Sequence, residues 1–170
     1  GLTGLAKKIK ARVNGGQNQI VVVIFGGTGS GKSTFALQLI RALDKDFKLD
    51  DVYIYSPKDL ARKIRDEIPQ RINWYDEGSV TLNSLETTTR KGKSFSKFFD
   101  TQRFDGWISL ICIPNSLEIQ KRILKHVDFL IECPDEAPIW GFYNKGFFNV
   151  IERTIWPKSG KIWDDTICSG

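Results

Sequence analysis

The chain has 170 residues, of which 41% are hydrophobic and 12% aromatic, and its formal net charge is +5. This length and composition fit a single domain with a hydrophobic core and exclude an intrinsically disordered chain. The longest apolar run, Ile20–Phe25, is far shorter than the roughly 20 residues needed to cross a bilayer, so no membrane span is expected.

Three regions are expected along the chain. Residues 1–18 would form a basic N-terminal arm or helix, residues 19–133 a core, and residues 134–170 a small β-rich extension packed on that core. Three cysteines, at positions 112, 133 and 168, are far apart and include no C-x-x-C pair. This spacing argues against a disulfide framework or a zinc site and fits a reducing compartment.

The apolar pattern predicts alternating strands and helices, which favours an α/β fold with a mostly parallel sheet flanked by helices. In the C-terminal extension, Trp140–Asn144 and Phe147–Ile151 are expected to form a hairpin. The core strands are expected at Ile20–Phe25, Val52–Tyr55, Arg71–Asp76, Trp107–Ile113 and Val127–Glu132. The helices are expected at Lys32–Lys45, Ser56–Glu67 and Ser116–Lys125.

A glycine-rich segment separates the first predicted strand from the first core helix. Its sequence from Gly26 to Ser33 matches the pattern G-x-x-x-x-G-K-[ST]. Glycines let successive backbone N–H groups turn toward phosphate oxygens, and the helix N-terminus adds further donors. Lys32 would reach the β- and γ-phosphates, and the Ser33 hydroxyl would bind Mg²⁺. The expected nucleotide-binding residues are Gly26, Gly27, Thr28, Gly29, Ser30, Gly31, Lys32, Ser33 and Thr34.

Two carboxylates stand at the end of the predicted strand Arg71–Asp76: Asp76 is its last residue and Glu77 follows it. Asp76 is expected to hold Mg²⁺ through water, and Glu77 to orient the water that attacks the phosphate. Adjacent residues leaving a strand point to opposite sides, so the two can serve different partners. The competing interpretation is a solvated turn.

Three other carboxylates lie on the predicted helix Ser56–Glu67, where their cationic neighbours indicate a solvated charged face. The carboxylates are Asp59, Asp66 and Glu67, and the neighbours are Lys58, Arg62, Lys63 and Arg65.

The strand Trp107–Ile113 is followed by Asn115, whose amide could sense the γ-phosphate or the attacking water. Pro-Asn-Ser is equally a good turn and N-cap for the next helix. Arg103 is the first candidate for an arginine that a neighbouring subunit supplies to the phosphate, Arg90 the second and Arg122 the third. The alternative for each arginine is an ordinary surface charge.

The segment 87–104 is rich in Lys and Arg, with phenylalanines between them. It could contact nucleic acid, with cations on the phosphates and aromatic rings stacked on bases. The alternative, which is favoured for the phenylalanines, is an amphipathic helix whose phenylalanines enter the core while its charges face water.

Several features follow one another in the sequence: Asp76-Glu77, the basic segment, Arg103, the apolar strand with a polar tip, the helix with Arg122 and the strand Val127–Ile131. In this order they resemble the FtsK–HerA group of P-loop ATPases. Viral DNA-packaging and zonula-occludens-toxin-like ATPases are most similar, over roughly residues 20–132. The group usually has Gln at the strand tip, where this chain has Asn115. The resemblance implies a RecA-like fold and a ring-shaped homo-oligomer that moves DNA, with its active site between subunits. The expected location is the cytoplasm, that of the host if the protein is viral.

The sequence thus predicts a Mg²⁺-dependent ATP hydrolase that translocates or packages DNA. Water would attack the γ-phosphate. No N-K-x-D motif is present, which favours ATP over GTP. Two alternatives are a small-molecule or nucleoside kinase and a nucleotide-dependent switch or assembly protein. The expected catalytic residues are Lys32, Glu77, Asn115, Arg103 and Arg90.

Overall fold

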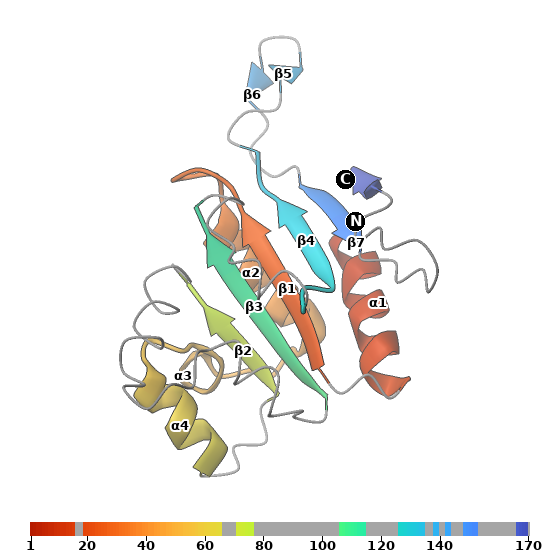
Figure 1. Cartoon of the computed structure of the whole chain (residues 1–170). Helices are drawn as coiled ribbons and strands as arrows, with labels where there is room; N and C mark the ends of the chain where they lie inside the picture. Colours follow the sequence, from red (N-terminus) through yellow and green to blue (C-terminus); the bar gives the residue numbers. More distant parts are fainter. Residues whose placement is uncertain are drawn as a thin grey trace.

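A central sheet of six strands organises the molecule (Figure 1), in the order β2-β3-β1-β4-β7-β8. The computed structural model describes residues 1–15, 19–65, 71–76, 106–114, 126–134, 138–139, 142–143, 148–152 and 166–169. The strands are β1 (Gln19–Phe25), β2 (Ile72–Tyr75), β3 (Trp107–Ile113), β4 (Phe129–Glu132), β7 (Asn149–Glu152) and β8 (Thr166–Ser169). β2, β3, β1 and β4 run parallel to one another, whereas β7 pairs antiparallel with both β4 and β8. The predicted α/β architecture with a mostly parallel sheet is confirmed.

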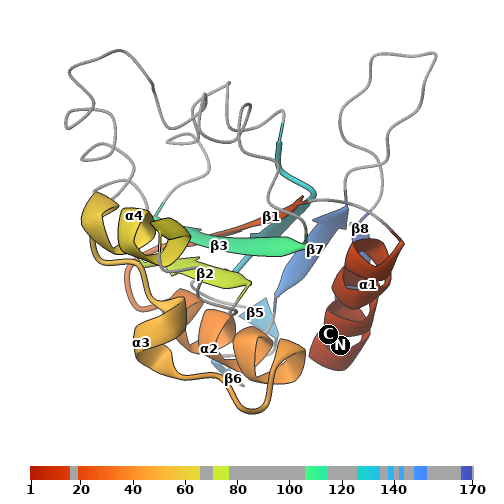
Figure 2. The same cartoon turned by 90° about the horizontal axis from the view of Figure 1, so that it is seen from below.

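Helices cover both faces of this sheet. α1 (Leu2–Asn14) and α2 (Lys32–Leu43) lie side by side on one face (Figure 2). The opposite face packs against Leu60 of α4 (Pro57–Arg65). Successive residues of β1 point alternately to these two faces, so Val22 packs with α1 and α2 while Val23 packs with Leu60. A continuous apolar run is what a strand buried on both faces requires, which explains the sequence of β1.

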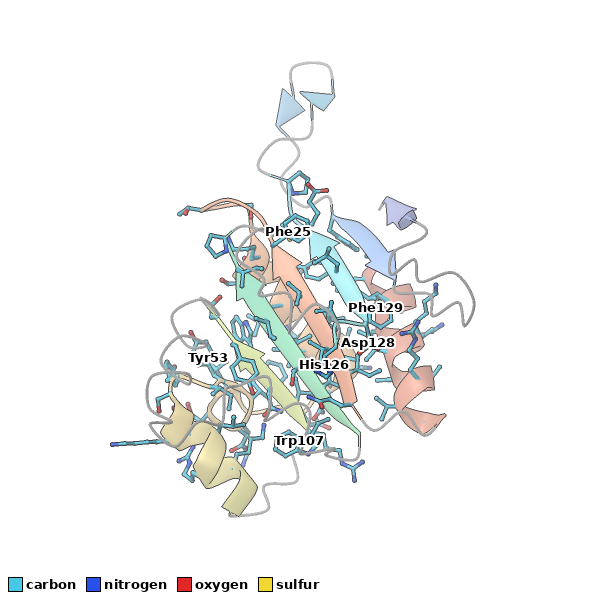
Figure 3. All side chains as sticks on the ribbon, viewed as in Figure 1. Phe25, Tyr53, Trp107, His126, Asp128 and Phe129 are labelled. Atoms are coloured by element: carbon cyan, nitrogen blue, oxygen red, sulfur yellow. The ribbon has the colours of Figure 1, made fainter. Side chains whose placement is uncertain are left out.

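The N-terminal helix is built into the core. Leu5, Ala6 and Ile9 of α1 are buried in the same cluster as α2 and β1. At the start of β4, the Asp128 carboxylate accepts a hydrogen bond of 2.9 Å from the Val21 N–H and lies 3.7 Å from the Arg12 guanidinium. The Arg12 guanidinium also lies 4.7 Å from the centre of the Phe129 ring, directly after Asp128 in sequence. Figure 3 shows Asp128 and Phe129 on the side of the sheet toward α1.

The predicted strand Val52–Tyr55 is wrong. Val52 ends a short helix, α3 (Leu49–Val52), and only Tyr53 forms a β-bridge, with Trp74 of β2. Acidic residues in the first turn of α3 favour the helix at its N-terminus. The segment still lies beside β2, because the Ile54 N–H donates to the Trp74 carbonyl at 2.9 Å and the Tyr53 and Trp74 rings meet edge-on at 4.9 Å.

The predicted C-terminal hairpin is also wrong. β5 (Pro138–Ile139) pairs with β6 (Phe142–Tyr143), and β7 instead joins the main sheet between β4 and β8. Phe148 and Val150 are buried in the core there, and the Phe148 ring lies 4.5 Å from that of Phe35 on α2. An isolated two-stranded hairpin would bury far less apolar surface, so pairing of β7 with the main sheet is more stable.

Lys63 is the third correction, because it is buried rather than solvated, with 2% of its surface exposed. Its Nζ donates to the Asp51 carbonyl at 2.7 Å and to the Ile72 carbonyl at 2.6 Å, and lies 5.8 Å from the Trp107 ring centre. Burial lowers the pKa of Lys63 from its ordinary 10.5 to about 8, although the nearby Asp51 carboxylate favours the charged form.

The predicted helix Ser116–Lys125 and the basic segment 87–104 lie outside the described residues. Among the helices that the structure does describe, none combines the length and the apolar character needed to cross a membrane.

Candidate nucleotide-binding site

The glycine-rich loop connects the end of β1 to the start of α2. Gly29 and Gly31 have left-handed φ angles of +84° and +93°, which favour glycine, and a Cβ added at either would meet nothing within 4 Å. Gly26 is different, because a Cβ there would lie 2.1 Å from the carbonyl oxygen of Cys133. The Cys133 N–H donates to the Phe25 carbonyl at 2.8 Å, so the end of β4 fixes the start of the loop.

The Lys32 side chain folds back onto the start of the loop. Its Nζ donates to the carbonyl oxygens of Gly26 at 2.8 Å and Gly27 at 2.6 Å. The middle of the loop, at Thr28 and Gly29, is exposed to solvent. The ammonium group is therefore held at a loop that a phosphate chain can reach from solution.

Ser33 and Asp76 meet although 43 residues separate them in sequence. The Ser33 hydroxyl lies 2.9 Å from Asp76 Oδ1 and 3.1 Å from Oδ2. Asp76 follows β2, and β3 lies between β2 and β1 in the sheet. Because these strands are parallel, their carboxyl ends meet at one edge, which brings the loop and the carboxylate together.

The donors at this edge fit a magnesium ion that arrives with a nucleotide. Ser33 and Asp76 supply hard oxygen atoms, which Mg²⁺ prefers, and Mg²⁺ typically takes its remaining ligands from phosphates and water. Within the described ranges, no group of three or more His, Cys, Asp or Glu side chains could hold a metal on its own. The Ser30 hydroxyl is buried and has no hydrogen-bond partner among the described residues, which leaves it available to a ligand oxygen.

Two thiols flank the base of the loop. Cys112 pairs with Ile24 across β3 and β1, and Cys133 directly follows β4. Burial raises the pKa of Cys112 to about 12 and that of Cys133 to about 11. Both thiols therefore stay protonated at neutral pH and act as small apolar side chains, as their place in strand-like runs predicts.

Sequence reasoning missed the part played by Cys133. Its carbonyl oxygen, and not its thiol, packs against Gly26. The available signal was its position directly after a strand that neighbours the loop strand.

Not every predicted site residue can be placed. Glu77, Arg90, Arg103, Asn115 and Arg122 lie outside the described residues. Thr34 is exposed in the first turn of α2. Among the competing carboxylates, Asp59 on α4 accepts a hydrogen bond of 2.9 Å from the hydroxyl of Ser56, the residue before the helix. Asp66 and Glu67 are outside the described ranges.

The site thus has a glycine loop between a central strand and a helix. The loop ends in Lys and Ser, and a carboxylate from two strands away lies beside it. These features define the class of P-loop nucleoside triphosphatases. The model of one family in this class, Novel STAND NTPase 3, matches residues 7–112, which is more than half of the chain. The protein belongs to this NTPase family. No curated protein matches the chain.

Proposed function

We propose that the protein hydrolyses ATP with Mg²⁺ at the loop between β1 and α2. The observation that carries this proposal is the contact of 2.9 Å between the Ser33 hydroxyl and the Asp76 carboxylate. Membership of an NTPase family supports nucleotide hydrolysis in general. The preference for ATP rests on the absence of an N-K-x-D motif from the sequence.

Each residue has a proposed part in the reaction. Lys32 and the loop N–H groups stabilise negative charge on the transferred phosphoryl group. Ser33 and Asp76 hold Mg²⁺, which when bound neutralises charge on the phosphate oxygens. Glu77, next to Asp76 in sequence, accepts a proton from the attacking water and orients it.

We further propose that hydrolysis drives movement of DNA by a homo-oligomer. In this proposal Asn115 senses the γ-phosphate, and Arg103 or Arg90 reaches it from the neighbouring subunit. The support is the resemblance to the FtsK–HerA group and the net positive charge of the chain.

Phosphate release tests both parts in one assay. Release from ATP should require Mg²⁺ and no acceptor molecule, and duplex DNA should stimulate it. Glu77→Gln should retain ATP binding by calorimetry and lose about 100-fold or more in turnover, since a positioned base typically contributes that much. Asp76→Asn should lose the Mg²⁺-dependent part of binding, whereas Asp59→Asn, a carboxylate held by Ser56 on α4, should keep it.

Each failure has a distinct meaning. No heat with Mg²⁺ and ATP would overturn the nucleotide site. Acceptor-dependent release would indicate a kinase, and binding without turnover would indicate a switch or assembly protein. Turnover that no nucleic acid stimulates would overturn only the coupling to DNA.

A further inference from the structure

The positive charge of the chain is concentrated at one end of the sequence. The first 43 residues contain six Lys and Arg and no Asp or Glu, and the first acid is Asp44. The remaining residues carry 19 cations against 20 acids, so the whole excess lies in the N-terminal segment. This segment forms α1, β1, the glycine loop and α2.

The fold gathers these cations on the outer side of one helical layer. α1 and α2 lie side by side on the same face of the sheet (Figure 2), and α1 turns Leu5, Ala6 and Ile9 inward. Two cations of the segment are engaged elsewhere, Arg12 with Asp128 and Lys32 with the glycine loop. We define the basic face as three exposed cations of this layer: Lys7, Lys10 and Arg41.

Neither helix carries an acid that offsets this charge. Lys7 and Lys10 are three residues apart on α1, a spacing at which like charges are neighbours and repel each other. By contrast, the exposed lysines Lys45 and Lys58 each have an acid beside them in sequence, and Lys48 has one two residues away on either side. The basic face therefore presents exposed positive charges on two neighbouring helices that contain no acid, and such a surface attracts a polyanion.

We propose that the basic face binds the phosphate backbone of nucleic acid, at a surface separate from the nucleotide loop. This inference rests on the DNA part of the proposed function and supplies a contact for it on α1 and α2. Phosphates spaced along a strand match cations presented along a helix, and each contact releases counterions from the nucleic acid.

A membrane surface rich in anionic lipid fits the charge but not the rest of α1. Helices that lie in a membrane interface insert Trp, Phe or Leu side chains from their outer side. The other exposed positions of α1 are Thr3, Gly4, Ala11 and Asn14, which offer no such side chain.

The test compares two triple variants with the same change in net charge. The first is Lys7→Ala with Lys10→Ala and Arg41→Ala. The second is Lys45→Ala with Lys48→Ala and Lys58→Ala, three exposed lysines that each neighbour or lie near an Asp. Binding of a labelled DNA duplex and of a labelled single strand is measured by fluorescence anisotropy across a salt series, without nucleotide.

The first variant should bind about tenfold or more weakly than wild type and should lower the slope of log affinity against log salt by about 2 to 3, roughly one per lost phosphate contact. The control variant should stay within about twofold of wild type, because its lysines make no phosphate contact. Basal ATP turnover without DNA and circular dichroism should match wild type for both variants, since none of the six residues belongs to the nucleotide site.

Equal weakening of both variants would overturn the proposal, because net charge alone would then explain binding. Unchanged binding by the first variant, or no DNA binding by wild type at low salt, would also overturn it. Binding of wild type to phosphatidylserine vesicles but not to DNA would assign the basic face to a membrane instead. DNA binding that depends on the basic face in a protein without ATP turnover would support this inference and reject the ATPase proposal.

Discussion

Gly26 shows how little room the nucleotide loop leaves at its start. The carbonyl oxygen of Cys133 occupies the space that any side chain at this position would need. Gly29, only three residues later, faces open space. The loop therefore has a fixed base and an open middle, which suits a site that must keep its shape while a ligand enters.

This contrast predicts different costs for the same substitution. Gly26→Ala should lower the free energy of unfolding by about 3 kcal/mol, because the new methyl group overlaps a backbone carbonyl that must move. Gly29→Ala should cost only about 1 kcal/mol, the strain of a left-handed φ in a residue with a Cβ. Urea unfolding of the two variants measures this difference. Equal losses would contradict the tight contact at Gly26.

The central elements of the fold were predictable because local signals are strong there. β1, the loop and α2 combine a continuous apolar run, a glycine pattern and a helical apolar pattern. The prediction of a strand at Val52–Tyr55 is wrong because four apolar and aromatic residues in a row do not distinguish a strand from the end of a helix. The prediction for the tail is wrong because β7 pairs with β4, which lies well before it in the chain (Phe129 pairs with Glu152, and Glu132 with Asn149). Sequence patterns do not encode such a choice between partners.

The N-terminal helix yields a prediction at this scale. Ile9 is 0% exposed in the cluster formed by α1, α2 and β1. Ile9→Ala should lower the free energy of unfolding by about 3 kcal/mol, the cost of lost apolar contact and a cavity. Leu37→Ala on α2, where Leu37 is 41% exposed, should change it by less than about 0.5 kcal/mol. Chemical denaturation of both variants provides the comparison, and an unaffected Ile9→Ala protein would mean that α1 does not contribute to the core.

The stability of the whole molecule should depend on pH through Lys63. Its pKa falls from 10.5 in the unfolded chain to about 8 in the folded protein. Between these two values the unfolded chain binds more protons, so the free energy of unfolding should rise with pH, by up to about 3 kcal/mol for this group. The lost charge leaves an amine that still has two N–H groups for the Asp51 and Ile72 carbonyls.

Cys112 and Cys133 act in the opposite direction above their ordinary pKa of 9.0, because their folded pKa values are raised. The difference between wild type and Lys63→Met cancels this shared contribution. Thermal or urea unfolding from pH 7 to pH 9.5 should therefore show wild type gaining stability relative to the variant. A constant difference over this range would refute the lowered pKa of Lys63.

Part of the candidate site was also predictable at the scale of the molecule. The spacing of motif and carboxylate, read with the rule that parallel strands end at one edge, was enough to expect Ser33 near Asp76. Lys63 could not be expected in the interior, because helix α4 has charges on most sides and its sequence does not show which one faces β2. The same holds for the basic face, which exists only because the fold lays α1 next to α2.

β2 is held unevenly, and this has a mechanical consequence. Its inner side forms a parallel ladder with β3, while its outer side has, among the described residues, one bridge at Tyr53. Lys63 anchors the beginning of the strand through the Ile72 carbonyl, and Asp76 sits past its far end. The far end of the strand is nevertheless packed, because Trp74 and Tyr75 are buried in the two core clusters, so moving this end would cost apolar contacts. A carboxylate carried on such a strand keeps its place beside Ser33, although one edge of the strand is only lightly paired.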